Sequence, residues 1–147
     1  MSYNNVDILF VEDNPDDAAL TIRALKKSGL TNKLFHVKDG AEALDFLYRR
    51  GDYADRKIGH PLKLILLDLK MPKVNGLEVL EQVKGDVQFH SVPVVILTSS
   101  KEDPDIKRCY ELRANSYIVK PVDSENFFQT IKDVSLYWMI LNVNEGL

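Results

Sequence analysis

Three carboxylates, a hydroxyl and an ammonium group each follow a short apolar run in this 147-residue chain. They belong to Glu12, Asp13, Asp68, Thr98 and Lys120. The runs are rich in Val, Ile and Leu without alternation, which is typical of strands buried on both faces of a parallel sheet. Ligands of open α/β sheets bind beyond the carboxyl ends of the strands. We therefore expect these side chains to converge on one crevice.

The chemistry that such a set could perform is phosphorylation of a carboxylate. A carboxylate and a phosphoryl donor are both negatively charged and repel each other, and a divalent cation bound between them reduces this repulsion. Oxygen ligands suit Mg²⁺, and we expect Asp13 and Asp68 to bind it directly, with Glu12 acting through water. Lys120 and the Thr98 hydroxyl would contact phosphoryl oxygens, and Asp68 would form the acyl phosphate.

The elements that must position these residues alternate strand and helix five times, which predicts parallel βαβ units. The fold class is thus α/β, a five-stranded parallel sheet with helices on both faces. The first helix is expected to begin near Pro15 after an Asn14 cap. Its buried face should carry Ala18, Ala19, Ile22, Ala24 and Leu25. The second strand is expected over 33–37, and later helices over 77–84, 105–112 and from about 123 to 142.

Residues 51–61 interrupt this pattern. They contain Gly51, Gly59 and Pro61 and are polar and broken, so we interpret them as a surface insertion. We expect one domain over 1–147, with this insertion, an extended C-terminal helix and no output domain.

Composition narrows the class of protein. The net charge of -3 argues against a nucleic-acid partner. The single cysteine, Cys109, favours a reducing compartment. Apolar stretches stay short of the ~20 residues of a membrane span, so we expect a cytoplasmic protein without a membrane partner. His36, His60 and His90 lack metal-ligand spacing, and we expect all three to be solvated.

Four segments together carry a resemblance to a known family. Glu12-Asp13, the stretch Asp68-Leu69-Lys70-Met71-Pro72-Lys73-Val74-Asn75-Gly76, Thr98-Ser99-Ser100 and Lys120-Pro121 resemble the receiver domain of two-component response regulators. The resemblance covers essentially the whole chain and implies the flavodoxin-like (βα)5 fold. The insertion, the third strand 64–69 and Trp138 are similar to stand-alone regulators of cyanobacterial phytochrome histidine kinases and bacteriophytochromes.

The resemblance assigns roles to particular residues. It implies that Asp68 is the phosphoacceptor, that Glu12 and Asp13 form the acidic pocket, and that the Lys70 backbone carbonyl is a further ligand of Mg²⁺, for which Mn²⁺ can substitute. Thr98 and Tyr117 match the family's switch pair, and the Lys120–Pro121 peptide is expected to be cis. The implied partners are a sensor histidine kinase, of the phytochrome type, and an unknown downstream protein. Such a protein is a signalling protein that catalyses only its own phosphorylation and dephosphorylation.

Other interpretations of the same residues exist. Tyr117 could be a packed aromatic, and Thr98 could cap the next helix. A haloacid-dehalogenase-like phosphatase would need a second acid two residues after its nucleophile, where this chain has Lys70. A flavodoxin-like cofactor binder would need a Ser/Thr/Gly-rich loop after the first strand, where the acidic stretch 12–17 would repel phosphate.

The last predicted helix is apolar most of the way round. Its core stripe leaves four apolar residues partly outside, namely Leu136, Tyr137, Met139 and Ile140. An exposed apolar patch marks an interface. We expect a homodimer or kinase-docking surface there, and the alternative is a terminal segment folded back on its own core.

Overall fold

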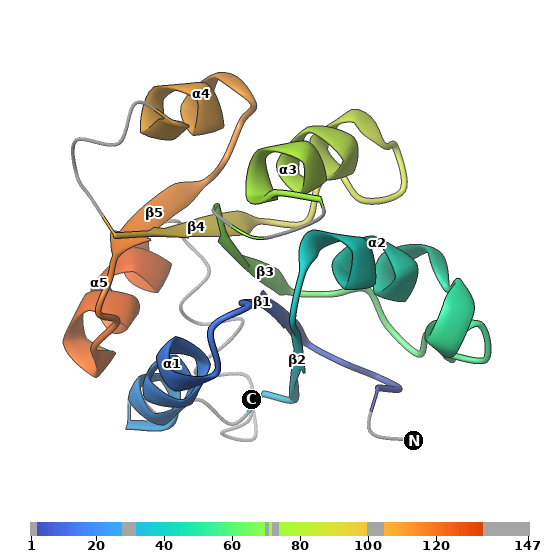
Figure 1. The fold of residues 1–147 in the computed structure, drawn as a ribbon, viewed down its shortest axis with the longest axis horizontal. Helices are drawn as coiled ribbons and strands as arrows, with labels where there is room; N and C mark the ends of the chain where they lie inside the picture. Colours follow the sequence, from blue (N-terminus) through green and yellow to red (C-terminus); the bar gives the residue numbers. More distant parts are fainter. Residues whose placement is uncertain (1–2, 28–31, 70, 72–73, 100–104, 134–147) are drawn as a thin grey trace.

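A parallel sheet forms the centre of the computed structural model, which describes residues 3–27, 32–69, 71, 74–99 and 105–133. The strands lie in the order β2-β1-β3-β4-β5, and every neighbouring pair is parallel (Figure 1). Their bounds are β1 (Ile8–Val11), β2 (Leu34–Val37), β3 (Leu64–Asp68), β4 (Val94–Thr98) and β5 (Ser116–Val119). The expected five-stranded α/β fold is confirmed, and the second strand begins one residue later than expected.

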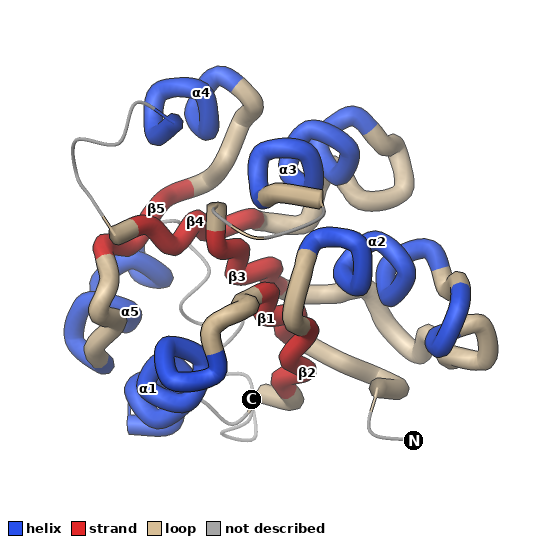
Figure 2. The backbone as a smooth tube through the Cα atoms, in the orientation of Figure 1, coloured by secondary structure: helices blue, strands red, loops and turns tan. Residues whose placement is uncertain are grey.

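Helices cover both faces of this sheet (Figures 1 and 2). One face carries α1 (Pro15–Lys27) and α5 (Ser124–Asp133), and the other carries α2 (Gly40–Tyr48), α3 (Gly76–Gly85) and α4 (Asp105–Glu111). Phe10 of β1 packs on the α1–α5 side with Leu25 and Phe127. Its neighbour Leu9 packs on the other side with Phe46. Because successive residues are buried on opposite faces, the strands appear in the sequence as unbroken apolar runs.

Helix α1 begins where the sequence predicts. The Asn14 side-chain oxygen accepts hydrogen bonds from the backbone N–H groups of Asp16 and Asp17, at 2.9 and 3.0 Å. The buried face contains Ala18, Thr21, Ala24 and Leu25, whereas Ala19 is exposed and Ile22 is only partly buried. The prediction for Ala19 is wrong because the stripe that meets the sheet recurs every three residues from Ala18, and Ala19 falls beside it.

The segment expected to be a surface insertion contributes to the core. Its first turn is a short 3-10 helix, η1 (Gly51–Tyr53), and both Tyr53 and Arg56 are buried. The Tyr53 ring lies edge-on to Phe46 of α2 at 5.4 Å, and its hydroxyl donates to the Glu42 carboxylate at 2.5 Å. Arg56 Nε donates to the Phe46 carbonyl at 2.9 Å, and the guanidinium lies 4.0 Å above that ring. The purely superficial interpretation is therefore wrong for these two residues.

The helix ends agree with expectation to within one or two residues for α3 and α4. Helix α5 is described as far as Asp133, so Leu136, Tyr137, Met139 and Ile140 lie outside the described residues. Across the described ranges, no helix combines the length and apolar character needed to cross a membrane.

Candidate functional site

The acidic residues meet at the carboxyl ends of β1 and β3, which are neighbouring strands in the sheet. These strands pair in register, Val11 beside Leu67, so that Glu12 and Asp68 follow as neighbours. One carboxylate oxygen from each of Glu12, Asp13 and Asp68 lies within 4.8 Å of the other two. Glu12 and Asp68 are buried, and Asp13 is exposed. The sequence prediction that these carboxylates converge is therefore matched by the geometry.

Glu12 is held at this position by the edge strand β2 and by the start of α1. Its backbone N–H donates to the Val37 carbonyl at 3.0 Å, and its Oε2 accepts from the Asn14 backbone N–H at 3.3 Å. His36 Nε2 lies 2.8 Å from the Glu12 carbonyl oxygen. Because a carbonyl only accepts, the proton of this bond belongs to Nε2. His36 is also half-buried, and its ring lies 5.3 Å from that of Phe10 at a tilt of 32°, so the expectation of a solvated imidazole is wrong here.

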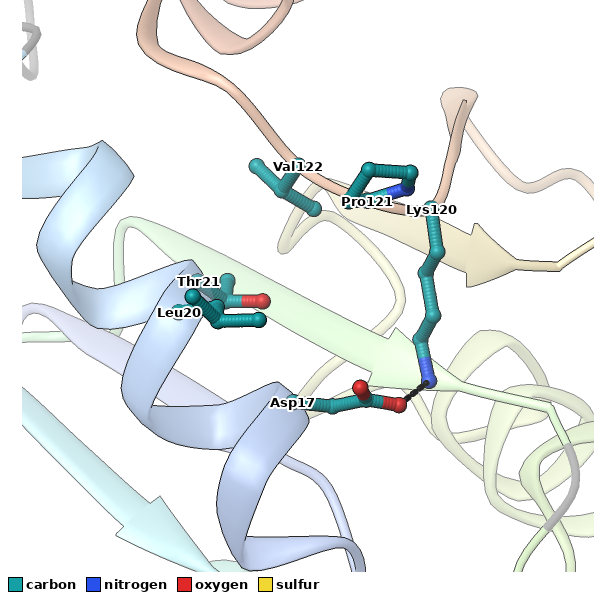
Figure 3. A pocket seen from close by; sticks show the side chains of 6 residues that line it. All are labelled: Asp17, Leu20, Thr21, Lys120, Pro121 and Val122. Carbon is teal, nitrogen blue, oxygen red and sulfur yellow. Dashed lines mark hydrogen bonds and ion pairs between the residues drawn. The ribbon is translucent and has the colours of Figure 1, made fainter.

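Lys120 contributes a positive charge to this acidic pocket. Among the described residues, it is the one cation for which the structure shows contacts with these carboxylates. It follows β5, and its peptide bond to Pro121 is cis, as the resemblance implies. Its Nζ lies 2.8 Å from Glu12 Oε1, 3.4 Å from Asp68 Oδ2 and 3.3 Å from Asp17 Oδ2. Figure 3 shows Asp17 reaching from α1 toward this ammonium group.

Asp17 was not singled out by the sequence argument. A signal was available, because Asp17 is an acidic residue in the first turn of a helix that begins at the crevice. What the sequence could not show is that the Asp17 side chain turns toward Lys120 after β5, which depends on the packing of α1 beside α5.

The electrostatics of the pocket are unbalanced toward negative charge. The pKa of Glu12 is raised to about 7, chiefly by burial and also by Asp68, while Lys120 opposes the shift. Burial alone would lower the pKa of Lys120, but its contacts with Glu12, Asp68 and Asp17 outweigh this and the pKa is raised. At neutral pH, Lys120 is thus fully charged, and Glu12 is divided between its protonated and charged forms.

The donor set fits a hard divalent cation. The three carboxylates lie close enough together to bind one ion, and Asp13 is exposed, so solvent can reach the cluster. Glu12 Oε1 is buried and makes no hydrogen bond of standard geometry, so its 2.8 Å contact with Lys120 is an ion pair. A buried carboxylate oxygen without a hydrogen bond is costly to leave alone, and binding near a cation would offset that cost.

The remaining residues of the predicted site are described in part. Thr98 ends β4, where it pairs with Val119 of β5, but its side chain lies outside the described set. The same holds for all of Lys70. Tyr117 is half-buried, and its ring lies edge-on to Tyr110 of α4 at 5.8 Å. Tyr117 is therefore a packed aromatic in this conformation, in contact with the helix that follows Thr98.

Comparison with known proteins gives the class. The response regulator receiver domain family matches residues 8–132 of the chain. The chain belongs to this family, which is the one that the sequence motifs resemble. Within it, the chain is homologous to regulators of the phytochrome class.

Three relatives illustrate the match. The probable methanogenesis regulatory protein FilR2 of Methanothrix harundinacea is 39% identical over 139 residues, covering 95% of this chain and 87% of that protein. Response regulator Rcp1 of Synechocystis sp. is 35% identical over 132 residues, covering 90% and 88%. A structure of its Mn²⁺-bound form aligns with a TM-score of 0.73 at 34% identity, covering 92% and 94%. The bacteriophytochrome response regulator RtBRR gives a TM-score of 0.83 at 52% identity, covering 92% and 81%.

Proposed function

We propose that Asp68 accepts a phosphoryl group from the phosphohistidine of a sensor kinase in a Mg²⁺-dependent reaction, and that the protein signals through protein contacts. The observation that carries this proposal is the buried Asp68 carboxylate, with Lys120 Nζ 3.4 Å away and two further acids beside it. One buried carboxylate would be explained by its ion pair with Lys120, whereas three carboxylates within reach of one another favour binding of a divalent cation as well.

The reaction assigns one task to each residue. Asp68 Oδ forms the new bond to phosphorus while the bond from phosphorus to the kinase imidazole nitrogen breaks, so that the acyl phosphate and a free histidine result. Lys120 neutralises charge on a phosphoryl oxygen, and the Thr98 hydroxyl donates to another. Asp13, Asp68 and the Lys70 carbonyl would hold Mg²⁺ directly and Glu12 through water. The ion supplies charge neutralisation between two anions, and Mn²⁺ can substitute for it.

The partners follow from the same proposal. Because Rcp1 and RtBRR are named as response regulators and RtBRR as a bacteriophytochrome one, we infer a sensor kinase of the phytochrome type. We also infer a cytoplasmic location, and that residues 1–147 form one receiver domain. A homodimer through Leu136, Tyr137, Met139 and Ile140 remains our proposal for the last-helix face. A haloacid-dehalogenase-like phosphatase is not supported, because the family is that of receivers.

Phosphotransfer from purified kinases tests the pathway. We expect a phosphorylated phytochrome-type kinase to lose its phosphoryl group to this protein within minutes in Mg²⁺, and to lose it far more slowly in EDTA. A phosphorylated kinase from an unrelated two-component pair is the matched control. If acetyl phosphate labels the protein but no phytochrome-type kinase transfers faster than the control, the pathway assignment is wrong and the receiver assignment stands.

Replacing Thr98 with Ala should uncouple phosphorylation from signalling. Thr98 and Tyr117 lie on adjacent strands, and a hydroxyl drawn toward the phosphoryl group would open space for the ring, which now contacts Tyr110 of α4. We expect the phosphorylated variant to lose most of a phosphorylation-induced gain in partner affinity that is typically about tenfold. Calorimetry with the phosphorylated proteins measures this, with the exposed Ser99→Ala as control. Wild-type affinity of the phosphorylated Thr98→Ala variant would disprove this route of coupling.

A further inference from the structure

We propose that Asp17 is a positioning residue that competes with the phosphoryl group for Lys120 and so limits both the phosphorylation rate and the affinity for phosphoryl mimics. This inference rests on the proposed function of Asp68. Its structural basis is the contact between Asp17 Oδ2 and Lys120 Nζ at 3.3 Å, shown in Figure 3, between two residues that line a small pocket beside α1.

The ammonium group of Lys120 has three N–H donors and three carboxylate neighbours. Glu12 is the nearest at 2.8 Å, while Asp17 and Asp68 lie almost equally far at 3.3 and 3.4 Å. A phosphoryl group on Asp68 would take over the place of the Asp68 oxygen. Asp17 would then face the phosphoryl group across the same ammonium group, as a second anion.

Two opposite effects of Asp17 must be weighed. It helps to hold the lysine in place, and it also neutralises part of the charge that the phosphoryl group needs. Asp17 accepts a hydrogen bond from Lys120 Nζ at 3.3 Å, but the Lys120 side chain is only 16% exposed and also forms a 2.8 Å ion pair with the fully buried Glu12. We expect that ion pair to keep the lysine in place when Asp17 is replaced, so the holding effect should be small. The charge effect therefore dominates.

The exposure of Asp17 means that solvent and salt can weaken its competition with the phosphoryl group for Lys120. Its side chain is 43% exposed, whereas that of Glu12 is fully buried, so solvent and ions reach Asp17 but not Glu12. Its backbone is fixed in the first turn of α1 by the Asn14 cap. The Asp17 carboxylate is thus attached to a fixed backbone and lies on the solvent-exposed side of Lys120. Because the pair is partly exposed, its effect is modest and decreases with salt.

Three substitutions separate the competing explanations. Asp17→Asn keeps an oxygen that accepts from Lys120 but removes the charge, Asp17→Ala removes both, and Asp17→Glu restores the charge. The matched control is Asp16→Asn, which removes the same charge from the same turn of α1 at an exposed residue whose backbone N–H bonds the Asn14 side chain. The two measurements are beryllofluoride affinity at saturating Mg²⁺ and the acetyl phosphate dependence of the labelling rate. The dependence of the labelling rate on acetyl phosphate concentration gives the half-saturating concentration and the maximal rate as separate values.

We expect Asp17→Asn to bind beryllofluoride about fivefold more tightly than Asp16→Asn, near the upper end for one partly exposed ion pair. Asp17→Asn should also be half-saturated at a lower acetyl phosphate concentration, and Asp17→Glu should return toward wild type. If Asp17→Asn equals Asp16→Asn, or if it and Asp17→Ala bind more weakly than wild type, the competition is disproved. If wild type itself neither binds beryllofluoride nor is labelled, the proposed function fails instead.

Discussion

The Asp68→Asn variant is expected to lose all Mg²⁺-dependent labelling by acetyl phosphate and by a phosphorylated kinase. An amide is no nucleophile toward phosphorus, and Asp68 is the carboxylate that the structure places against Lys120 at the end of β3. The measurement is incorporation of radioactive phosphate, with mass spectrometry of the intact protein. Asp16→Asn, which removes the same charge from an exposed residue, should be labelled as wild type.

Loss of labelling must be separated from loss of the fold. Asn has nearly the same volume as Asp, and the substitution removes one negative charge from a pocket in which the described residues place Glu12, Asp13 and Asp17 together with Lys120. We therefore expect the thermal midpoint of Asp68→Asn to equal or exceed that of wild type. Acid-stable, base-labile phosphate retained on this variant would show that another residue is the acceptor.

In the absence of divalent cations, the free energy of unfolding is expected to fall as pH rises from about 4.5 to about 7. Glu12 has an ordinary pKa of 4.5 and a raised pKa of about 7 in the folded protein. Between these values the folded state holds a proton that the unfolded state has released, so a rise in pH favours unfolding. The full contribution is on the order of 3 kcal/mol, at about 1.4 kcal/mol for each pKa unit.

Urea denaturation at several pH values measures this contribution as a difference between proteins. Glu12→Gln mimics the protonated side chain and should lack the fall, while Glu81→Gln, at an exposed site on α3, should show it in full. Mg²⁺ favours the charged form of Glu12, so its stabilising effect on wild type should grow with pH over the same range. Parallel pH profiles for wild type and Glu12→Gln would contradict the raised pKa.

The fold and most of the pocket could be predicted from the sequence because both depend on local patterns. Unbroken apolar runs indicate strands buried on both faces, and parallel strands deliver their following residues to one edge. Glu12, Asp68 and Lys120 therefore converge without any knowledge of the packing. The family resemblance then added the cis peptide before Pro121, which no local pattern indicates.

The contacts that the sequence did not predict all arise between elements. Asp17 meets Lys120 only because α1 lies beside α5. His36 donates to Glu12 because β2 is the neighbour of β1, and the period of a strand does not reveal its partners. Ala19 was misplaced because a run of small residues does not define which side of a helix meets the sheet.

Tyr53 and Arg56, which are buried within the insertion 51–61, have a practical consequence for reporters and affinity tags. Surface loops usually tolerate inserted sequence, but a fusion placed within residues 51–61 would displace the groups that bond Glu42 and the Phe46 carbonyl and would expose the end of α2. The turn after α3 is a better location. Val87 is 87% exposed there, and that turn lies outside the acidic pocket, so a fused reporter would leave Asp68 unobstructed.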